Sequence, residues 1–236
     1  MSAITTTPPT VPTDSGLAQA PLPTFGDHRT VFRGVSWEAY RSLSQAYSDG
    51  EHIRLAFDGK DLEIMTTGNL NENLKELISR IVTALVSWVG IAFVSFGEAT
   101  VDAVNAQRGL QADLSYCFDP EKVRAAREAL ACESMDPADY PKPDLAVEID
   151  ISPSRIDRPT IYSALRIAEV WHVLRGRKVV IEHLQPDGSY APAEASRFLP
   201  IRADEIAVWL TAEDVGLEEV WNRRLNEWAM GLGRRA

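Results

Sequence analysis

The sequence predicts an α/β protein in which a mixed β-sheet is flanked by helices, and three observations support this fold class. Several short segments alternate apolar and polar residues, which is typical of strands, and residues 71–89 repeat apolar positions at helical spacing. Segments of the two kinds are interleaved along the chain instead of forming separate blocks. A length of 236 residues, 45% hydrophobic and 25% charged, fits one globular domain with a substantial core.

The beginning of the chain differs in composition from the rest. Residues 1–30 are rich in Thr, Pro, Ser and Ala, so we expect a disordered tail with no role in the core. Ser36 then suits the N-cap of a helix that ends near Tyr47. In "IRLAFDGKDLEIM" the turn residues DGKD separate two apolar runs, which predicts a hairpin over residues 53–65.

Strands and helices alternate through the rest of the chain. The segment "GLQADLSYCF", residues 109–118, predicts one strand with Leu114 on one face and Asp113 on the other. Asp157 suits the N-cap of the helix that follows it. The other predicted elements are helices over 71–89, 121–132, 158–168, 203–210 and 216–230 and strands over 91–95, 99–104, 143–151, 170–174 and 178–184.

The strand "PDLAVEIDI", residues 143–151, has one apolar and one acidic face. Its even positions are Asp144, Ala146, Glu148 and Asp150, and its odd positions from 145 onward are apolar. Carboxylates crowded on one strand repel one another unless a cation lies among them. This strand therefore predicts a site for a divalent metal ion.

Strand geometry indicates which carboxylates can share an ion. Asp144 and Glu148 lie about 13 Å apart along the strand, whereas Glu148 and Asp150 lie about 7 Å apart and their side chains can converge. If the strand of Asp113 pairs with the acidic strand, Asp113 can reach the same ion from about 4.8 Å away. Ligation by oxygen alone favours Mg²⁺ or Mn²⁺ over Zn²⁺. Arg158 begins the next helix and could fold back to bind a phosphate with its guanidinium.

Several of these side chains also have plainer interpretations. Asp144 is better explained as a cap or turn residue at the start of the strand than as a ligand. Asp150 is either the second ligand or a surface residue at the strand end. Glu72 opens the long helix, where a carboxylate complements the helix dipole. For His172, a packed or surface histidine is favoured over a metal ligand.

Charge is unevenly distributed along the sequence. The net charge of −10 argues against broad, non-specific binding of nucleic acid. The segment after the acidic strand is locally basic, which suits a phosphate-bearing substrate; a solvated helix and turn is the alternative. Its basic residues are Arg155, Arg158, Arg166, Arg175, Arg177 and Lys178.

Cysteine content and hydropathy indicate the compartment. Cys117 and Cys132 cannot form a disulfide framework, and their spacing does not match zinc-ligand pairs. The N-terminus lacks the basic start and apolar core of a secretion signal, and no apolar run approaches the roughly 18 residues of a membrane span. We therefore expect a cytoplasmic protein with reduced thiols and no membrane association.

The blocks "RLAFDGKDLEIM", "GLQADLSYCF", "PDLAVEIDISPSRIDRPTIYSAL" and "AEVWHV" resemble the Uma-two family of endonuclease-like proteins. That family belongs to the PD-(D/E)XK superfamily, with the restriction-endonuclease-like fold. The likeness extends from about residue 37 to 200. It implies a PD-(D/E)XK nuclease-like domain over 31–202, and the expected tail over 1–30 and a C-terminal helical extension over 203–236 lie outside the likeness.

The resemblance also implies roles for individual residues. Asp113 and Glu148 would be the metal-binding acids of the second and third motifs. Where the superfamily has a lysine this chain has Asp150, and Arg158 stands where the family is thought to carry its displaced basic residue. Glu72 is the nearest match to the acidic residue of the first core helix.

This chain departs from the family pattern in three places. It has Asn71 where a histidine is frequent, Gln111-Ala112-Asp113 in place of Glu-Pro-Asp, and Arg166-Ile167-Ala168 in place of Gly-Val-Pro. Because an arginine also replaces the lysine at 158, the likeness implies metal binding more directly than turnover.

Two functions remain from this reasoning. The first is a Mg²⁺-dependent (or Mn²⁺-dependent) endonuclease that hydrolyses phosphodiester bonds of DNA, with carboxylates holding the ion that activates water. The second is a catalytically inactive nuclease-like module that binds nucleic acid or a protein partner. A homodimer is expected in the first case, since enzymes that cut both strands of a duplex often pair two sites.

Overall fold

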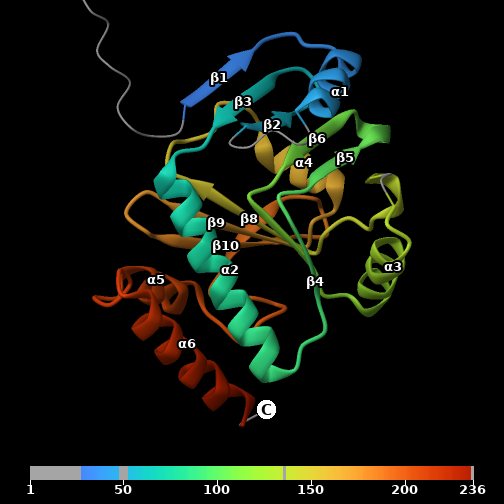
Figure 1. Cartoon of the computed structure of the whole chain (residues 1–236). Helices are drawn as coiled ribbons and strands as arrows, with labels where there is room; N and C mark the ends of the chain where they lie inside the picture. Colours follow the sequence, from blue (N-terminus) through green and yellow to red (C-terminus); the bar gives the residue numbers. More distant parts are fainter. Residues whose placement is uncertain (1–27, 48–52, 135–136, 235–236) are drawn as a thin grey trace, which may run out of the picture.

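The computed structural model describes residues 28–47, 53–134 and 137–234, which form an α/β structure with two sheets (Figure 1). The larger sheet has six strands in the order β11-β10-β9-β8-β7-β4, and only the β8–β9 pair is parallel. Its strands are β4 (Val94–Gly97), β7 (Leu114–Cys117), β8 (Leu145–Asp150), β9 (Glu169–Leu174), β10 (Val179–Leu184) and β11 (Tyr190–Ala193). The fold class expected from the sequence is confirmed.

The smaller sheet has five antiparallel strands in the order β1-β3-β2-β6-β5 and lies above the larger sheet in Figure 1. The strands are β1 (His28–Phe32), β2 (Ile53–Phe57), β3 (Leu62–Thr66), β5 (Thr100–Ala103) and β6 (Arg108–Gln111). β2 and β3 form the predicted hairpin. Two short 3-10 helices lie outside the sheets, at Val104–Ala106 and Pro137–Asp139.

The helices cover the faces and ends of the two sheets. They are α1 (Trp37–Ala46), α2 (Asn69–Val89), α3 (Pro120–Ala131), α4 (Arg158–Leu165), α5 (Ala203–Thr211) and α6 (Glu218–Gly233). The predicted N-caps are confirmed: Ser36 accepts a hydrogen bond from the Ala39 amide, and Asp157 from the Thr160 amide. None of the described helices is long and apolar enough to cross a membrane.

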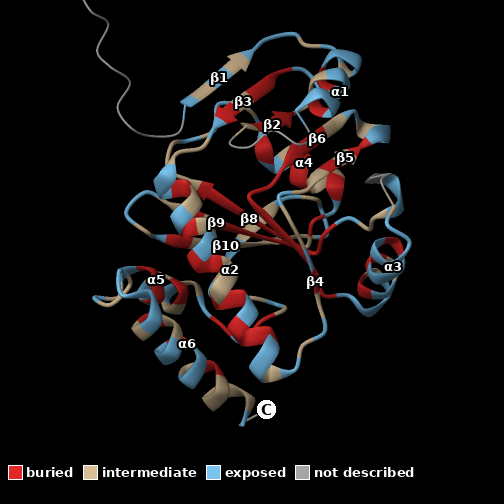
Figure 2. Cartoon of the chain, in the orientation of Figure 1, coloured by how far each residue is buried: buried red, intermediate tan, exposed pale blue. Residues whose placement is uncertain are grey.

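Strand β8 is buried on both faces, so its acidic face is not a solvated one. Its odd residues join a core formed with α2, α5 and α6, whereas Ala146 packs in a second core with Ile161 and Leu165 of α4. Figure 2 shows the resulting buried layer through β8, β9 and the inner side of α2. Leu210 and Trp221 place α5 and α6 in the same core as α2.

Two expectations about the elements are wrong. Residues 28–30 are not part of a tail without a role, because β1 begins at His28 and pairs with β3; residues 1–27 lie outside the described residues. The single strand expected over 109–118 is two strands, β6 and β7, which belong to different sheets. The chain crosses between the sheets at Ala112 and Asp113, and this crossing positions Asp113 at their junction.

Candidate functional site

The predicted pairing of the Asp113 segment with the acidic strand is confirmed. β7 runs antiparallel to β8 with Leu114 opposite Val147, so Asp113 lies beside Glu148 on the next step of the ladder. The Ile149 amide donates a 2.7 Å hydrogen bond to Asp113 Oδ2. Both carboxylates are only 1% exposed.

Burial sets the electrostatics of this carboxylate pair. It raises the pKa of Asp113 to about 7, with a further contribution from the charge of Glu148. Burial also raises the pKa of Glu148, against the opposing effect of the Arg158 charge. Among the described residues, no donor makes a hydrogen bond of normal geometry to Asp113 Oδ1 or Glu148 Oε1, although Arg54 Nε lies 3.6 Å from the first and the nearby Tyr162 hydroxyl acts to lower the pKa of Glu148. Buried oxygens without donors are costly, and a bound cation would compensate them.

Arg158 lies against this pair, as its place at the start of α4 suggested. Its Nη1 atom is 2.6 Å from Glu148 Oε2 and 3.8 Å from Asp150 Oδ1. Burial opposes the charged form, but the charges of Glu148 and other neighbours hold the pKa of Arg158 well above its ordinary value. The guanidinium is therefore a permanent positive charge at the site and cannot serve as a base.

Two residues of the site were missed from the sequence, Arg29 and Glu63. Arg29 extends from β1, with Nη1 2.5 Å from Glu63 Oε2, Nη2 3.0 Å from Asp150 Oδ1, and Nε donating to Ser152 Oγ. Glu63 also accepts hydrogen bonds from the Arg155 amide at 2.7 Å and from Ser154 Oγ at 3.0 Å. A carboxylate within the apolar strand "LEIM" is the same signal that identified Glu148 and could have identified Glu63. Arg29 lay in the segment assigned to the tail.

Asp150 uses both of its oxygens in the described contacts. Oδ1 pairs with Arg29, and Oδ2 lies 2.8 Å from His172 Nδ1, whose Nε2 is 3.4 Å from Glu182 Oε2. Burial disfavours the imidazolium, but Asp150 and Glu182 raise the pKa of His172 to about 9. His172 is therefore a charged partner of Asp150. The assignment of Asp150 as a metal ligand stays a prediction, since its oxygens are taken up by these cations.

Asp144 and Glu72 have local roles in the structure. Asp144 Oδ2 accepts from the Phe118 and Asp119 amides at 2.7 and 2.8 Å, and Oδ1 from Lys122 Nζ, which confirms its role at the start of the strand. Glu72 lies in the first turn of α2 and contacts Thr67 and Lys75.

A polar chain leads from Glu72 towards Asp113. Lys75 pairs with both Glu72 and Glu98, Glu98 also pairs with Arg54, and Arg54 lies beside Asp113. Glu72 is thereby connected to the carboxylate pair through three intervening side chains.

The described residues do not form a three-carboxylate metal site. Within residues 28–47, 53–134 and 137–234, no group of three or more His, Cys, Asp or Glu side chains is arranged to hold a metal ion. Among the described carboxylates, Asp113 and Glu148 are the two with a buried oxygen that lacks a hydrogen-bond partner, so water or substrate would supply the other ligands. Mg²⁺ is commonly bound in this way, through one or two carboxylates and several waters.

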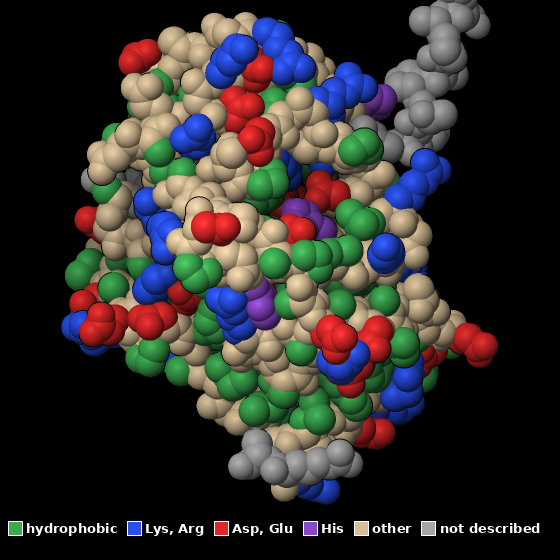
Figure 3. Space-filling model, turned by 180° about the vertical axis from the view of Figure 1, so that it is seen from behind, with side chains coloured by type: hydrophobic (Ala, Val, Ile, Leu, Met, Phe, Trp, Pro, Cys, Tyr) green, Lys and Arg blue, Asp and Glu red, His purple; other side chains and the backbone are tan. Residues whose placement is uncertain are grey.

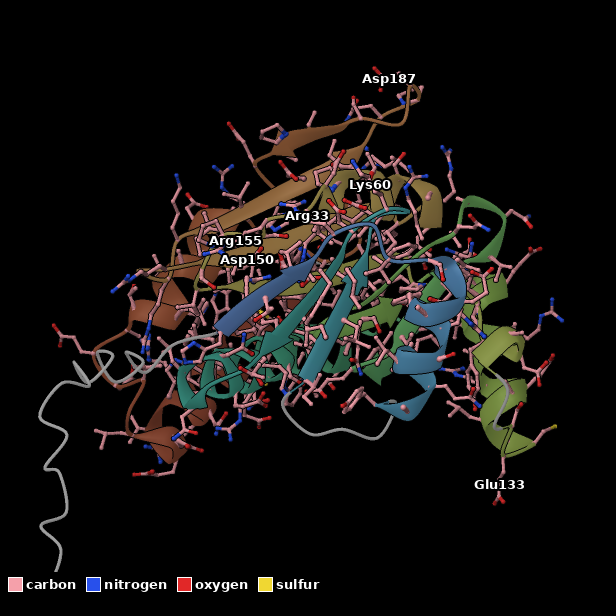
Figure 4. All side chains as sticks on the ribbon, turned by 90° about the horizontal axis from the view of Figure 1, so that it is seen from above. Arg33, Lys60, Glu133, Asp150, Arg155 and Asp187 are labelled. Atoms are coloured by element: carbon pink, nitrogen blue, oxygen red, sulfur yellow. The ribbon has the colours of Figure 1, made fainter. Side chains whose placement is uncertain are left out.

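The basic segment predicted from the sequence does not form one patch. Arg158 is buried, and Arg166 and Arg175 lie at opposite ends of β9. Figure 4 shows Arg155 next to Asp150, with Arg33 and Lys60 on the same side of the molecule. From behind, acidic and histidine side chains are seen together near the middle of the face (Figure 3). Arg29 and Arg158 near the end of β8 lie among the carboxylates of Glu63, Glu148 and Asp150, so this region holds charges of both signs.

Comparison with known proteins agrees with the likeness of the sequence blocks. No curated protein matches the chain. A family model, Uma2, described as "Putative restriction endonuclease", matches residues 37–212. The match includes Asp113, Glu148 and Arg158 and begins after β1, so Arg29 lies outside it. The chain belongs to the Uma2 family.

Proposed function

We propose that this protein is a Mg²⁺- or Mn²⁺-dependent endonuclease that hydrolyses phosphodiester bonds of DNA. One observation carries the proposal: Asp113 and Glu148 lie side by side at the junction of the sheets, each with one buried oxygen that lacks a donor. The family description supports a nuclease. The oxygen-only pair suits Mg²⁺ or Mn²⁺ better than softer metals.

Asp113 and Glu148 would hold the ion, and each is oriented by the protein. The Ile149 amide binds Asp113 Oδ2, and Arg158 binds Glu148 Oε2, which leaves one oxygen of each carboxylate for the metal. A bound ion would supply an activated water and neutralise charge on the phosphate.

The chain's own cations would bind the substrate. Arg158 keeps its charge at all ordinary pH values, and its planar guanidinium matches a phosphate geometrically. Arg29 lies on the other side of Asp150 and Glu63, so two guanidinium groups lie beside the carboxylates. Because these groups are buried, their attraction for a phosphate is screened less than at an exposed surface.

Cleavage of supercoiled plasmid and of single-stranded DNA, with Mg²⁺ or Mn²⁺, tests the proposal. Glu148→Gln keeps the side-chain shape but removes the charge, so we expect cleavage to fall at least about 100-fold. Glu227→Gln removes an exposed carboxylate from α6 and serves as the matched control. Equal cleavage by wild type and Glu148→Gln would point to a contaminating nuclease and contradict the assignment.

A second function is favoured by the ion pair of Arg158 with Glu148 and by the 1% exposure of both carboxylates. In an inactive nuclease-like module, Arg158 would take the place of the metal and satisfy Glu148. This function predicts that nucleic acid or a protein partner binds equally well in EDTA, and that the wild type cleaves neither DNA substrate with either metal.

A further inference from the structure

A hollow of about 410 Å³ lies beside α3, but a second hollow, of about 370 Å³, has the more distinctive chemistry. It lies at the end of β9 opposite Asp150 and has no acidic residue in its lining. The lining residues are Arg166, Ala168, Leu184, Gln185, Pro186 and Arg197. Two arginines facing one hollow are unexpected in a chain of net charge −10.

Arg166 occupies a backbone position that ordinarily favours glycine. It is the C-cap of α4, with φ of +58° in the left-handed region. The residue is exposed, and in the described part of the chain its guanidinium has no hydrogen bond or ion pair. An arginine kept at a strained position with a free charge suggests that its side chain has a binding role.

Arg197 is anchored by its backbone, and most of its guanidinium is left free. Its amide donates a 2.7 Å hydrogen bond to Glu169 Oε2, and the other oxygen of this fully buried carboxylate accepts from Trp171 Nε1. The Arg197 side chain makes one long hydrogen bond, 3.4 Å from Nη2 to the Leu184 carbonyl oxygen. The remaining guanidinium donors have no described acceptor.

We propose that this hollow, lined by Arg166 and Arg197, binds a phosphate group of a nucleic-acid backbone. Guanidinium groups match phosphate oxygens by two parallel hydrogen bonds, and Gln185 adds a polar side chain to the lining. The identity of the polymer rests on the proposed function, whereas the affinity for phosphate does not.

The position of the hollow fits a substrate that also reaches the carboxylate pair. Glu148 is adjacent to His172 across β8 and β9, and Ala168, which comes just before β9, precedes His172 by four residues. Four residues of strand span about 13 Å, which is about four base-pair steps of a duplex. Because Ala146 and Val170 on this face are buried under α4, a nucleic acid that reaches both places would pass over the outer side of α4 and bring a neighbouring phosphate to Arg166 and Arg197.

Binding measured without cleavage tests the proposal. Fluorescein-labelled single-stranded and duplex oligonucleotides are titrated in EDTA at several salt concentrations, with wild type and an Arg166→Gly, Arg197→Gln double variant. We expect affinity to fall at least about tenfold and the slope of log K against log salt to fall by about 1 to 2. The matched control is Arg124→Gln, Arg223→Gln, which removes two exposed charges from α3 and α6 and leaves affinity within about twofold.

A titration with inorganic phosphate distinguishes a site for free phosphate from a site for the phosphates of a nucleic-acid backbone. Arginine Nε–H signals of Arg166 and Arg197 are followed by NMR during a phosphate titration, and thermal unfolding shows that the variants are folded. If the Nε–H signals change with phosphate but the double variant keeps its affinity for oligonucleotides, the ligand is not the phosphate of a nucleic acid and the proposal is overturned. Equal behaviour of wild type and double variant with both probes, or no binding of either, would overturn the site. Because EDTA prevents metal-dependent cleavage, this binding experiment can succeed or fail independently of the cleavage experiment that tests the endonuclease proposal.

Discussion

At the scale of single residues, the site is a network of buried charges in which Glu63 is central. Glu63 binds Arg29 and the backbone of Arg155, and it lies 3.8 Å from Arg158 Nη2. Burial works against its ionised form, but the hydrogen bonds from Arg155 and Arg29 lower the pKa of Glu63 from its ordinary value of 4.5. The carboxylate therefore stabilises the fold above that ordinary value, and the stabilisation is lost as the pH falls through the folded pKa.

Glu63→Gln is expected to lower the free energy of unfolding at neutral pH by about 3 kcal/mol, because it leaves buried arginines without their partner. The difference between wild type and variant should begin to shrink as the pH falls below about 4.5, and it should be lost as the pH falls through the lower folded pKa of Glu63, where the wild-type carboxylate becomes protonated. Urea unfolding at a series of pH values measures both effects. The exposed Glu227→Gln is the control, and a difference that does not change with pH would contradict this role of Glu63.

A second prediction at this scale concerns the backbone strain at Arg166. Because its φ of +58° is disfavoured for residues with a Cβ, Arg166→Gly should stabilise the fold by about 1 kcal/mol. Arg166→Ala keeps the Cβ and should bring no such gain. Thermal unfolding of the two variants decides the point: equal midpoints would mean that the backbone at 166 is unstrained.

At the scale of elements, the close approach of β6 to α1 and β5 determines which residue can occupy position 109. Tyr40 Oη of α1 donates a 2.8 Å hydrogen bond to Asp102 of β5, directly over Gly109. A Cβ at this position would collide with both the Tyr40 hydroxyl and the Asp102 carboxylate. The glycine therefore allows α1 to attach to the smaller sheet.

Gly109→Ala is expected to destabilise the protein by about 2 kcal/mol, since overpacking at a rigid contact forces side chains to move. Gly216→Ala is the control, because a Cβ there meets no atom within 4 Å. Chemical unfolding of both variants checks the expectation, and similar stabilities would show that the Tyr40–Asp102 contact yields easily.

At the scale of the whole molecule, two cores share β8, so events at the carboxylate pair should affect global stability. Metal binding to the folded state alone raises the free energy of unfolding by about 2.7 kcal/mol at a concentration one hundred times Kd. We expect Mn²⁺ or Mg²⁺ to raise the unfolding temperature of wild type, and EDTA to reverse this.

Asp113→Asn and Glu148→Gln should each abolish the metal-dependent rise, whereas Glu227→Gln should retain it. Calorimetric scans with and without metal provide the measurement. A rise that persists in both site variants would place the metal elsewhere. The homodimer expected for cutting both strands stays a prediction at this scale.

Sequence patterns were sufficient to predict the helices and most strands, but not β1, β11 or the division of residues 109–118, and they also pointed to the central carboxylate pair. Apolar periodicity located α2, β8 and the hairpin of β2 and β3, because helices and strands bury one set of regularly spaced side chains. The alternation of β8 singled out Glu148, and strand spacing placed Asp113 within reach of it on the condition that the two strands pair, which the structure confirms. Both inferences depend on local geometry, which a sequence displays directly.

The surroundings of that pair depend on contacts between distant parts of the chain. Arg29 meets Asp150 across 121 residues of chain, and no local pattern encodes such a contact. The division of residues 109–118 between two sheets, the burial of Arg158 at the start of α4 and the separation of Arg166 from Arg175 follow from packing in three dimensions. The free energy of burying a charge depends on its partners, and those partners are brought together only by the fold.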